Sequence, residues 1–224
     1  MQGIAGFIYA RTDSKRFPNK IFKRFGQRYL IDIVVQRLRC TDIDSIYLLT
    51  SERELDDPLA IHCESQGIKV FRGCFEDVVL RTVQAINAFS VEKFLRVNGD
   101  SPFISPALIN YSLRYSNDKK FVSNLFNRTF PYGVAIELMD CDWYCENANS
   151  RLEANKEHLT HHLYTNVSSG DAYSITQNYE LQNHRLTIDT MEDYFGLKSI
   201  LSENYLIEYW DFLKCPRPKF NISE

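Results

Sequence analysis

Short apolar runs alternate with stretches of helical periodicity in the first hundred residues, and this alternation constrains the fold more than any other feature. The runs are rich in β-branched and aromatic residues and nearly continuous, as in strands buried on both faces of a parallel sheet. They occupy residues 3–10, 45–50, 68–71 and 93–98, and the helical stretches between them occupy 29–40, 56–67 and 75–89. Consecutive strand–helix units of this length predict right-handed crossovers and a doubly wound, mostly parallel α/β sheet.

Two positions in the helical stretches allow finer predictions. Arg37 borders the apolar stripe of residues 29–40, so we expect its stem on the core and its charged head in water. Gly67 directly follows residues 56–66 and is predicted to end that helix as a glycine cap.

The regularity loosens after Pro102. Residues 128–170 have a mixed pattern, and we expect them to form a small insertion or a dimerisation arm within one domain that covers 1–224. The predicted elements are a helix over 105–115, strands over 121–125 and 131–139, a helix over 154–167, and a strand, turn and helix over 184–201.

Composition narrows the class of protein. A hydrophobic content of 44% and a charged content of 25% are ordinary for a globular domain. The net charge of −3 gives no reason to expect nucleic acid as a partner. No apolar run approaches the roughly 20 residues that span a bilayer, and the start of the chain lacks the pattern of a signal peptide. We therefore expect a cytoplasmic protein with no membrane partner.

The cysteines and histidines offer weak metal-site candidates. Six cysteines are scattered along the chain, which favours reduced thiols. Cys141 and Cys145 form a CxxxC, which is not a zinc-ribbon spacing. His158 and His162 are four apart on one expected helical face, but no HExxH order and no third ligand accompany them. Packing or substrate contacts are the favoured alternative to zinc.

A basic cluster follows the first predicted strand. Residues 11–28 contain seven basic residues and one acidic residue. Ligands of open α/β sheets bind beyond the carboxyl ends of the strands, so Arg11, Lys15, Arg16 and Lys20 are predicted to surround a polyphosphate. A solvated basic surface is the alternative. No P-loop or GxGxxG motif occurs.

Two aspartates also follow predicted strands. Asp100 comes after a glycine at the end of residues 93–98, and Asp189 lies between a predicted strand and helix. Carboxylates facing a phosphate loop suit Mg²⁺, whereas helix capping is the ordinary role of an acid at such a place. Together with the basic loop, the two aspartates predict one site for a polyphosphate and a metal.

Four motifs and one further short segment, within residues 4–200, resemble those of the cytidylyltransferases that activate acidic sugars. "ARTDSKRFPNKIFKRFG" is similar to their amino-terminal signature, "VNGDSPFI" to their V-Q-G-D-x-P-L-I segment, and "IDTMEDY" to their [VI]-D-T-x-E-D-[LFY]. "VFRGCFEDVVLR" and "KEHLT" resemble segments of the branch typified by spore-coat polysaccharide biosynthesis protein F.

This resemblance implies a glycosyltransferase-A-like α/β fold that joins CTP to the hydroxyl of an acidic sugar and releases pyrophosphate with Mg²⁺. It also implies a homodimer in surface-polysaccharide biosynthesis. The implied roles are catalysis for Arg11 and Lys20, nucleotide binding for Ser14, Arg16, Arg72, Asp77, Arg81 and Asn98, metal binding for Asp100 and Asp189, and sugar binding for Glu157 and His158.

Three positions depart from the family pattern. Asp13 replaces a glycine or alanine and puts a carboxylate into the phosphate loop. Asn19 replaces a frequent glycine but tolerates positive φ, and Lys156 replaces an arginine.

Two alternatives to a cytidylyltransferase therefore stay open. One is a glycosyltransferase or another nucleotidyltransferase of the same fold, for which Asp42-Ile43-Asp44 supplies a DxD sequence. The other is a non-catalytic nucleotide-binding relative, which Asp13 favours because it weakens the case for triphosphate binding.

Overall fold

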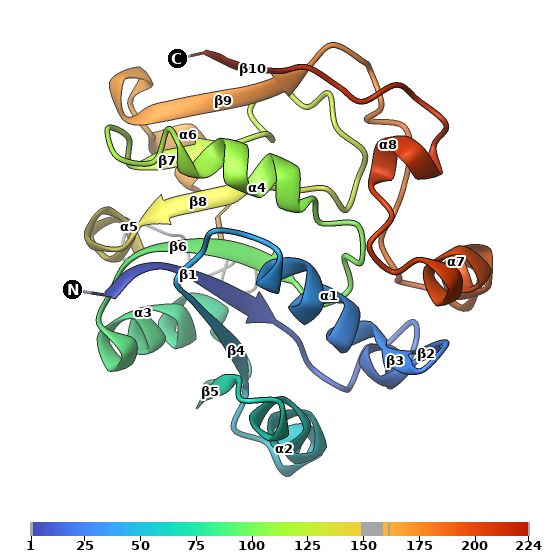
Figure 1. Cartoon of the computed structure of the whole chain (residues 1–224). Coiled ribbons are helices and arrows are strands. Elements are labelled where there is room, and N and C mark those ends of the chain that lie inside the picture. The colour runs from blue at the N-terminus through green and yellow to red at the C-terminus, as the bar shows by residue number, and fades with distance from the viewer. Residues whose placement is uncertain (1, 149–158, 161, 224) are drawn as a thin grey trace.

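One eight-stranded mixed sheet organises the protein (Figure 1). The computed structural model describes residues 2–148, 159–160 and 162–223. The strand order is β10-β9-β7-β8-β6-β1-β4-β5. These strands are β1 (Gln2–Tyr9), β4 (Ser45–Ser51), β5 (Lys69–Gly73), β6 (Val91–Asn98), β7 (Phe121–Ser123), β8 (Glu137–Asp140), β9 (Ala172–Gln177) and β10 (Phe220–Ser223), and a separate hairpin pairs β2 (Arg24–Phe25) with β3 (Arg28–Tyr29).

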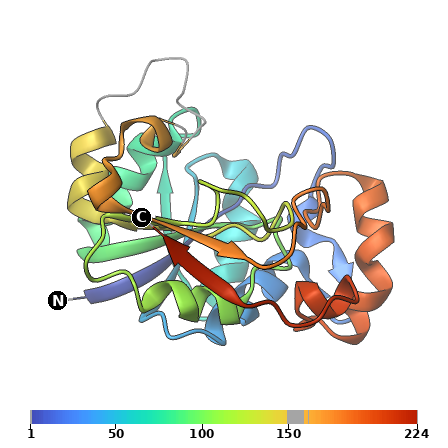
Figure 2. The same ribbon diagram turned by 90° about the horizontal axis from the view of Figure 1, so that it is seen from above.

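Helices cover both faces of the sheet. In Figures 1 and 2, α1 and α4 lie on one face, and α3, α5 and α6 lie on the other. The helices are α1 (Leu30–Arg39), α2 (Asp57–Ser65), α3 (Val78–Phe89), α4 (Pro106–Leu113), α5 (Cys141–Ala148), α6 (Leu163–Asn166), α7 (Met191–Glu203) and α8 (Tyr209–Phe212), with 3₁₀ turns η1 (Lys20–Phe22), η2 (Glu54–Asp56) and η4 (Ser169–Asp171). This arrangement confirms the doubly wound α/β fold. None of the described helices has the length and apolar character needed to cross a membrane.

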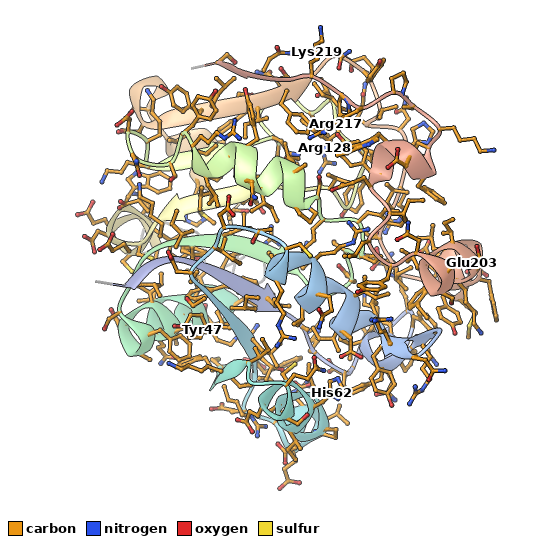
Figure 3. All side chains as sticks on the ribbon, viewed as in Figure 1. Tyr47, His62, Arg128, Glu203, Arg217 and Lys219 are labelled. Carbon is orange, nitrogen blue, oxygen red and sulfur yellow. The ribbon has the colours of Figure 1, made fainter. Side chains whose placement is uncertain are left out.

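Alternation along β1 divides the apolar residues into two cores. Ile8 packs with α1 and α4 on one face, whereas Phe7 points to the other because successive side chains of a strand face opposite ways. Phe7 stacks on Phe94 at 5.2 Å, and Tyr47, labelled in Figure 3, stacks on Phe89 of α3 at 4.0 Å. Both cores are thus built around the same central strand.

The order of the parallel strands determines where a ligand can bind. β1 pairs in parallel with β4 on one side and with β6 on the other, while β5 extends the sheet beyond β4. The chain runs from β1 through β4 to β5, and then returns past β1 to β6. This reversal leaves a crevice at the carboxyl ends of β1 and β6.

The second half of the chain is less regular than its sequence pattern predicts. The predicted strand over 131–139 is wrong for its first part, since β8 begins at Glu137. Gly133 has φ +100° and lies close to the Leu186 backbone, and the Asn124 side chain bonds the amide of Ile136 and the carbonyl of Val134. These side-chain bonds replace a strand ladder.

The predicted strand before α7 is also absent from the described sheet. Residues 184–189 contribute an isolated bridge between Arg185 and Tyr132. The Tyr132 amide donates to His184 and its carbonyl accepts from Leu186. The predicted helix over 154–167 falls largely outside the described residues. Of this predicted range, the structure describes the helix α6 at its end. The role of 128–170 as an insertion or arm stays a prediction.

Gly67 has φ +77° and follows α2 as predicted, but the prediction for Arg37 is wrong. Its side chain is fully buried. The guanidinium donates to the carbonyls of Ile104, Tyr205 and Ile207. Burial lowers the pKa of Arg37 to about 10, so it stays a cation at neutral pH. Arg37 is thus a core cross-link.

Arg37→Met is expected to lower the free energy of unfolding by about 3 kcal/mol, because one buried and two part-buried carbonyls lose their donor. Urea denaturation measures this loss. Arg39→Met is the matched control: Arg39 is exposed and bonds one carbonyl, that of Gln66. Equal unfolding midpoints for the two variants would contradict the role assigned to Arg37.

Candidate functional site

A cavity of about 540 Å³ opens at the carboxyl ends of β1 and β6. Its wall comes from the loop after β1, the end of β6, the first turns of α3 and the loop before α7. The lining residues are Tyr9, Ala10, Arg11, Ser14, Lys15, Arg16, Lys20, Ile21, Phe75, Val78, Arg81, Arg96, Asn98, Gly99, Asp100, Leu159 and Asp189.

The loop between β1 and η1, residues 10–19, is held in shape by its backbone. The amide of Asn19 donates to the Thr12 carbonyl at 2.9 Å, and Asn19 has φ +55°, a conformation that asparagine tolerates better than most residues. Gly99 lies against this loop, where a Cβ would lie 2.8 Å from that of Ala10. The loop therefore turns back tightly and directs its basic side chains into the cavity.

Asp56, fully buried at the start of α2, anchors the same loop. It accepts 2.8 Å hydrogen bonds from the amide and the hydroxyl of Thr12, together with one from Ser51. Burial raises the pKa of Asp56, but the hydrogen bonds from Ser51 and Thr12 and the charge of Arg53 outweigh it and hold the pKa below its ordinary value. The anchor is therefore an ionised carboxylate.

Asp56 makes the stability of the protein pH-dependent. Because its folded-state pKa lies below its unfolded value, its contribution is complete above the unfolded pKa and is lost as pH falls through the folded pKa. We expect the urea midpoint of the wild type to fall between pH 5 and 3, a range set by ordinary carboxyl pKa values near 4. Asp56→Asn should be less stable at pH 7 and should lose less between pH 5 and 3. If the urea midpoints of the wild type and of Asp56→Asn fell in parallel with pH, Asp56 would not be the source of this pH dependence.

Lys20 brings the two aspartates together. Its ammonium donates to Asp100 at 2.7 Å and to Asp189 at 2.9 Å. The backbone joins the same two loops, since the Ile188 amide donates to the Asp100 carbonyl at 2.9 Å. Asp100 and Asp189, which lie 80 and 169 positions after Lys20 along the chain, thus meet Lys20 at one point of the cavity.

Neither aspartate caps a helix. Ser105 caps α4 by accepting from the Leu108 amide. Thr190 caps α7, and Asp193 accepts from the amides of Asp189 and Thr190 at 2.8 Å. The carboxylates of Asp100 and Asp189 are therefore left for the cavity.

Asp189 is held by cations on two sides. Arg16 lies 3.1 Å from one of its oxygens, and Arg185 pairs with the other. Burial raises the pKa of Asp189, but the hydrogen bond and charge of Lys20, with Arg16 and Arg185, bring it below its ordinary value. Asp189 is thus an anion in contact with three cations, Arg16, Lys20 and Arg185.

The inner end of the cavity is cationic as well. Arg96 pairs with the buried Glu137, and the Tyr9 hydroxyl bonds Thr82 at 2.9 Å. Arg81 is 6% exposed, its Nε has no hydrogen-bond partner among the described residues, and burial lowers its pKa. Arg81 is therefore a hydrogen-bond donor at this end of the cavity that suits acceptor atoms of a ligand.

Comparison with known proteins identifies the family of this chain. A family model for cytidylyltransferases matches residues 5–207, which include every loop that lines the cavity. The chain belongs to the cytidylyltransferase family. It is 31% identical to the spore coat polysaccharide biosynthesis protein SpsF of Bacillus subtilis, over 89% of this chain and 87% of that protein. This similarity confirms the branch that the motifs indicate.

Solved structures agree with this family. A cytidylyltransferase from Leptospira borgpetersenii serovar Hardjo-bovis superposes with a TM-score of 0.86 at 28% identity, covering 94% of this chain and 92% of that one. CMP:2-keto-3-deoxy-manno-octonic acid synthetase, solved with CTP, gives a TM-score of 0.65 at 13% identity over 89% and 98% of the chains. The second similarity concerns the fold alone. The protein is thus a nucleotidyltransferase with the expected fold.

Most residues named from the cytidylyltransferase motifs line the cavity: Arg11, Ser14, Arg16, Lys20, Arg81, Asn98, Asp100 and Asp189. Arg72 lies outside it, paired with Asp57 and bonded to the carbonyls of Ser51 and Arg53. Asp77 caps α3 by accepting from the Leu80 amide at 2.8 Å. Glu157 and His158 lie outside the described residues.

Sequence reasoning missed several residues that shape the cytidylyltransferase cavity. Arg185 precedes Asp189 by four residues, a spacing that is a weak signal in a loop. Tyr9 and Arg96 belong to predicted strands. The alternation of side chains along a strand assigns each of them to one face of the sheet, but it does not show that a cavity opens on that face. Asp56 and Arg53 carry no local signal of a role in the loop, because their loop partners, Thr12 and Asp13, lie 44 and 40 residues away along the chain.

Other candidate sites have no part in this cavity. Asp42 and Asp44 precede β4 at its amino end, where Asp44 accepts from the Ile4 amide. Asp140, part of a second D-x-D sequence, pairs with Lys120 at the end of β8. All six cysteines are free thiols. In the described residues no group of three or more His, Cys, Asp and Glu side chains is arranged to hold a metal.

Proposed function

We propose that this cytidylyltransferase transfers CMP from CTP to a hydroxyl of a sugar, and that the sugar is acidic, of the nonulosonic or octulosonic type. The sugar oxygen attacks the α-phosphorus, the bond from that phosphorus to the bridging oxygen breaks, and pyrophosphate leaves. The observation that carries the proposal is Lys20 bonded to both Asp100 and Asp189 beside Arg11 and Arg16 in one cavity. Phosphoryl transfer requires such charge neutralisation more than covalent catalysis.

The carboxylate pair fits Mg²⁺. Asp100 and Asp189 offer hard oxygen ligands, and the Lys20 ammonium already sits between them as a cation. These two carboxylates would hold Mg²⁺, an ion that retains part of its hydration when few protein ligands bind it. When bound, the ion neutralises phosphate charge and lowers the pKa of the attacking hydroxyl. In this proposal the Lys20 ammonium would contact the phosphates when the triphosphate is bound.

The basic loop provides the remaining phosphate contacts in this proposal. Arg11 and Arg16 present planar donors that fit phosphate oxygens in pairs, and Lys15 adds a point charge. The Ser14 hydroxyl lines the same wall. Charge on four neighbouring cations suits the several negative charges of a triphosphate.

The acceptor and the pathway rest on the relatives. The SpsF relative is named for spore coat polysaccharide biosynthesis, and the structural neighbour solved with CTP is named for a keto-deoxy-octonic acid. Surface polysaccharide biosynthesis is therefore the proposed pathway. A homodimer through 128–170 and a cytoplasmic location stay predictions.

Pyrophosphate release tests the proposal. The protein, with Mg²⁺, is incubated with CTP, UTP, GTP or ATP and a panel of acidic and neutral sugars. Release that requires both CTP and one acidic sugar, with a CMP-sugar detected by mass spectrometry, is the expected result. Release with a different nucleotide, or with a neutral sugar alone, would contradict the finer assignment. CTP binding with no release for any sugar would favour a non-catalytic relative.

A further inference from the structure

We propose that Arg53 is a positioning residue for the nucleotide: it neutralises Asp13 inside the basic loop and so leaves Arg11 available for the triphosphate. The proposal rests on the proposed function, because it takes a nucleoside triphosphate as the ligand of this loop. It accounts for the one acidic residue in a segment with seven basic ones.

Asp13 lies between two guanidinium groups that hold it unequally. Arg53 donates from Nη1 to Oδ2 of Asp13 at 2.8 Å. Nε of Arg11 lies 3.4 Å from the other oxygen, Oδ1, which has no hydrogen-bond partner among the described residues. Arg53 is therefore the group that binds Asp13, while Arg11 stays close to it without a formed hydrogen bond.

Arg53 is itself fixed in place from several directions. Its Nε donates to the Ser51 hydroxyl at 3.1 Å, and Nη2 lies 3.4 Å from the buried Asp56. The guanidinium carbon lies 3.5 Å from the centre of the Phe75 ring, a stacking contact that orients a guanidinium well. The hydrogen bond to Asp13 raises the pKa of Arg53. The cation opposite Asp13 is thus permanent and preorganised.

Arg11 and Arg53 differ in their position relative to the cavity, and therefore in the role that we propose for each. Arg11 lines the cavity, and its guanidinium lies 5.2 Å from the centre of the same Phe75 ring. Arg53 packs on this ring and is not part of the cavity wall. Without Arg53, Arg11 is the cation of the described residues that remains paired with Asp13. The carboxylate would then compete with the triphosphate for Arg11 and repel the phosphates.

Removal of Arg53 alone and together with Asp13 tests this division. Calorimetry of CTP with Mg²⁺ compares the wild type with Arg53→Ala, Asp13→Asn and the double variant. We expect Arg53→Ala to weaken CTP binding about tenfold. Asp13→Asn should bind CTP at least as tightly as the wild type. The double variant should bind within about threefold of Asp13→Asn. Arg39→Ala, at an exposed arginine remote from the loop, is the matched control.

Rescue separates charge neutralisation from a structural role. If Arg53 merely supports the loop through Ser51, Asp56 and Phe75, the double variant would bind as weakly as Arg53→Ala, and the proposal would be overturned. Wild-type affinity in Arg53→Ala would overturn it as well. Thermal melting checks that each variant folds, and Arg53→Gln, which keeps donors without the charge, replaces Arg53→Ala if the latter unfolds. Absence of CTP binding by the wild type would instead contradict the proposed function.

Discussion

Asp100→Asn is expected to lower kcat for pyrophosphate release by about a hundred- to a thousandfold, the range typical for loss of one group that stabilises charge in a transition state. The change removes one negative charge and alters no volume. Asp100 is part-exposed and makes its ion pair with Lys20, so the fold should tolerate the amide. The loss should appear in kcat more than in the affinity for CTP, because the basic loop still binds the phosphates.

The matched control for this prediction is Asp211→Asn, which makes the same change at an exposed position of α8. Its kcat should equal that of the wild type. Thermal melting should give similar midpoints for both variants. Pyrophosphate release by Asp100→Asn within a few-fold of the wild type would remove Asp100 from the proposed metal site.

Lys20→Met is expected to change two measurements in opposite directions. Nucleotidyl transfer should fall about a hundredfold or more, because the triphosphate loses a part-buried cation. Binding of Mn²⁺ to the nucleotide-free protein should become about tenfold tighter. The ammonium that lies 2.7 Å and 2.9 Å from the two carboxylates no longer competes with the metal.

Electron paramagnetic resonance of Mn²⁺ measures free and bound metal for this prediction without any turnover. In the wild type, Mn²⁺ should bind weakly alone and tightly with CTP, since the triphosphate draws Lys20 away from the carboxylates. Lys23→Met is the control, because Lys23 lies over the Phe17 ring and not on the cavity wall. Unchanged or weaker Mn²⁺ binding in Lys20→Met would show that the ammonium does not occupy the metal position.

The first half of the fold could be predicted from local pattern because each element there carries its own signal. Apolar continuity marks β1, β4, β5 and β6, and 3.6-residue periodicity marks the helices between them. The second half could not be predicted as well. The predicted strand over 131–139 contains Gly133, whose position depends on contact with Leu186, a residue more than fifty positions away.

The candidate site could be predicted in part for a similar reason. Lys20, Asp100 and Asp189 each follow a strand or precede a helix, and the rule that ligands bind at the carboxyl ends of strands brings them to one edge. Arg72 and Asp77 also belong to such a motif, but Arg72 pairs with Asp57 and Asp77 accepts from the Leu80 amide of α3. A motif match names a residue but does not orient its side chain.

The sequence by itself determined the family of this protein, the doubly wound sheet and the positive charge beside β1, because these follow from residue types and their order. Tertiary structure alone decided which partner each charged side chain contacts. It buried Arg37 among three carbonyls, placed Arg185 against Asp189 and gave Asp13 the partner Arg53. The physical reason is that an ion pair forms at about 3 Å in space, a distance that bears no relation to separation along the chain.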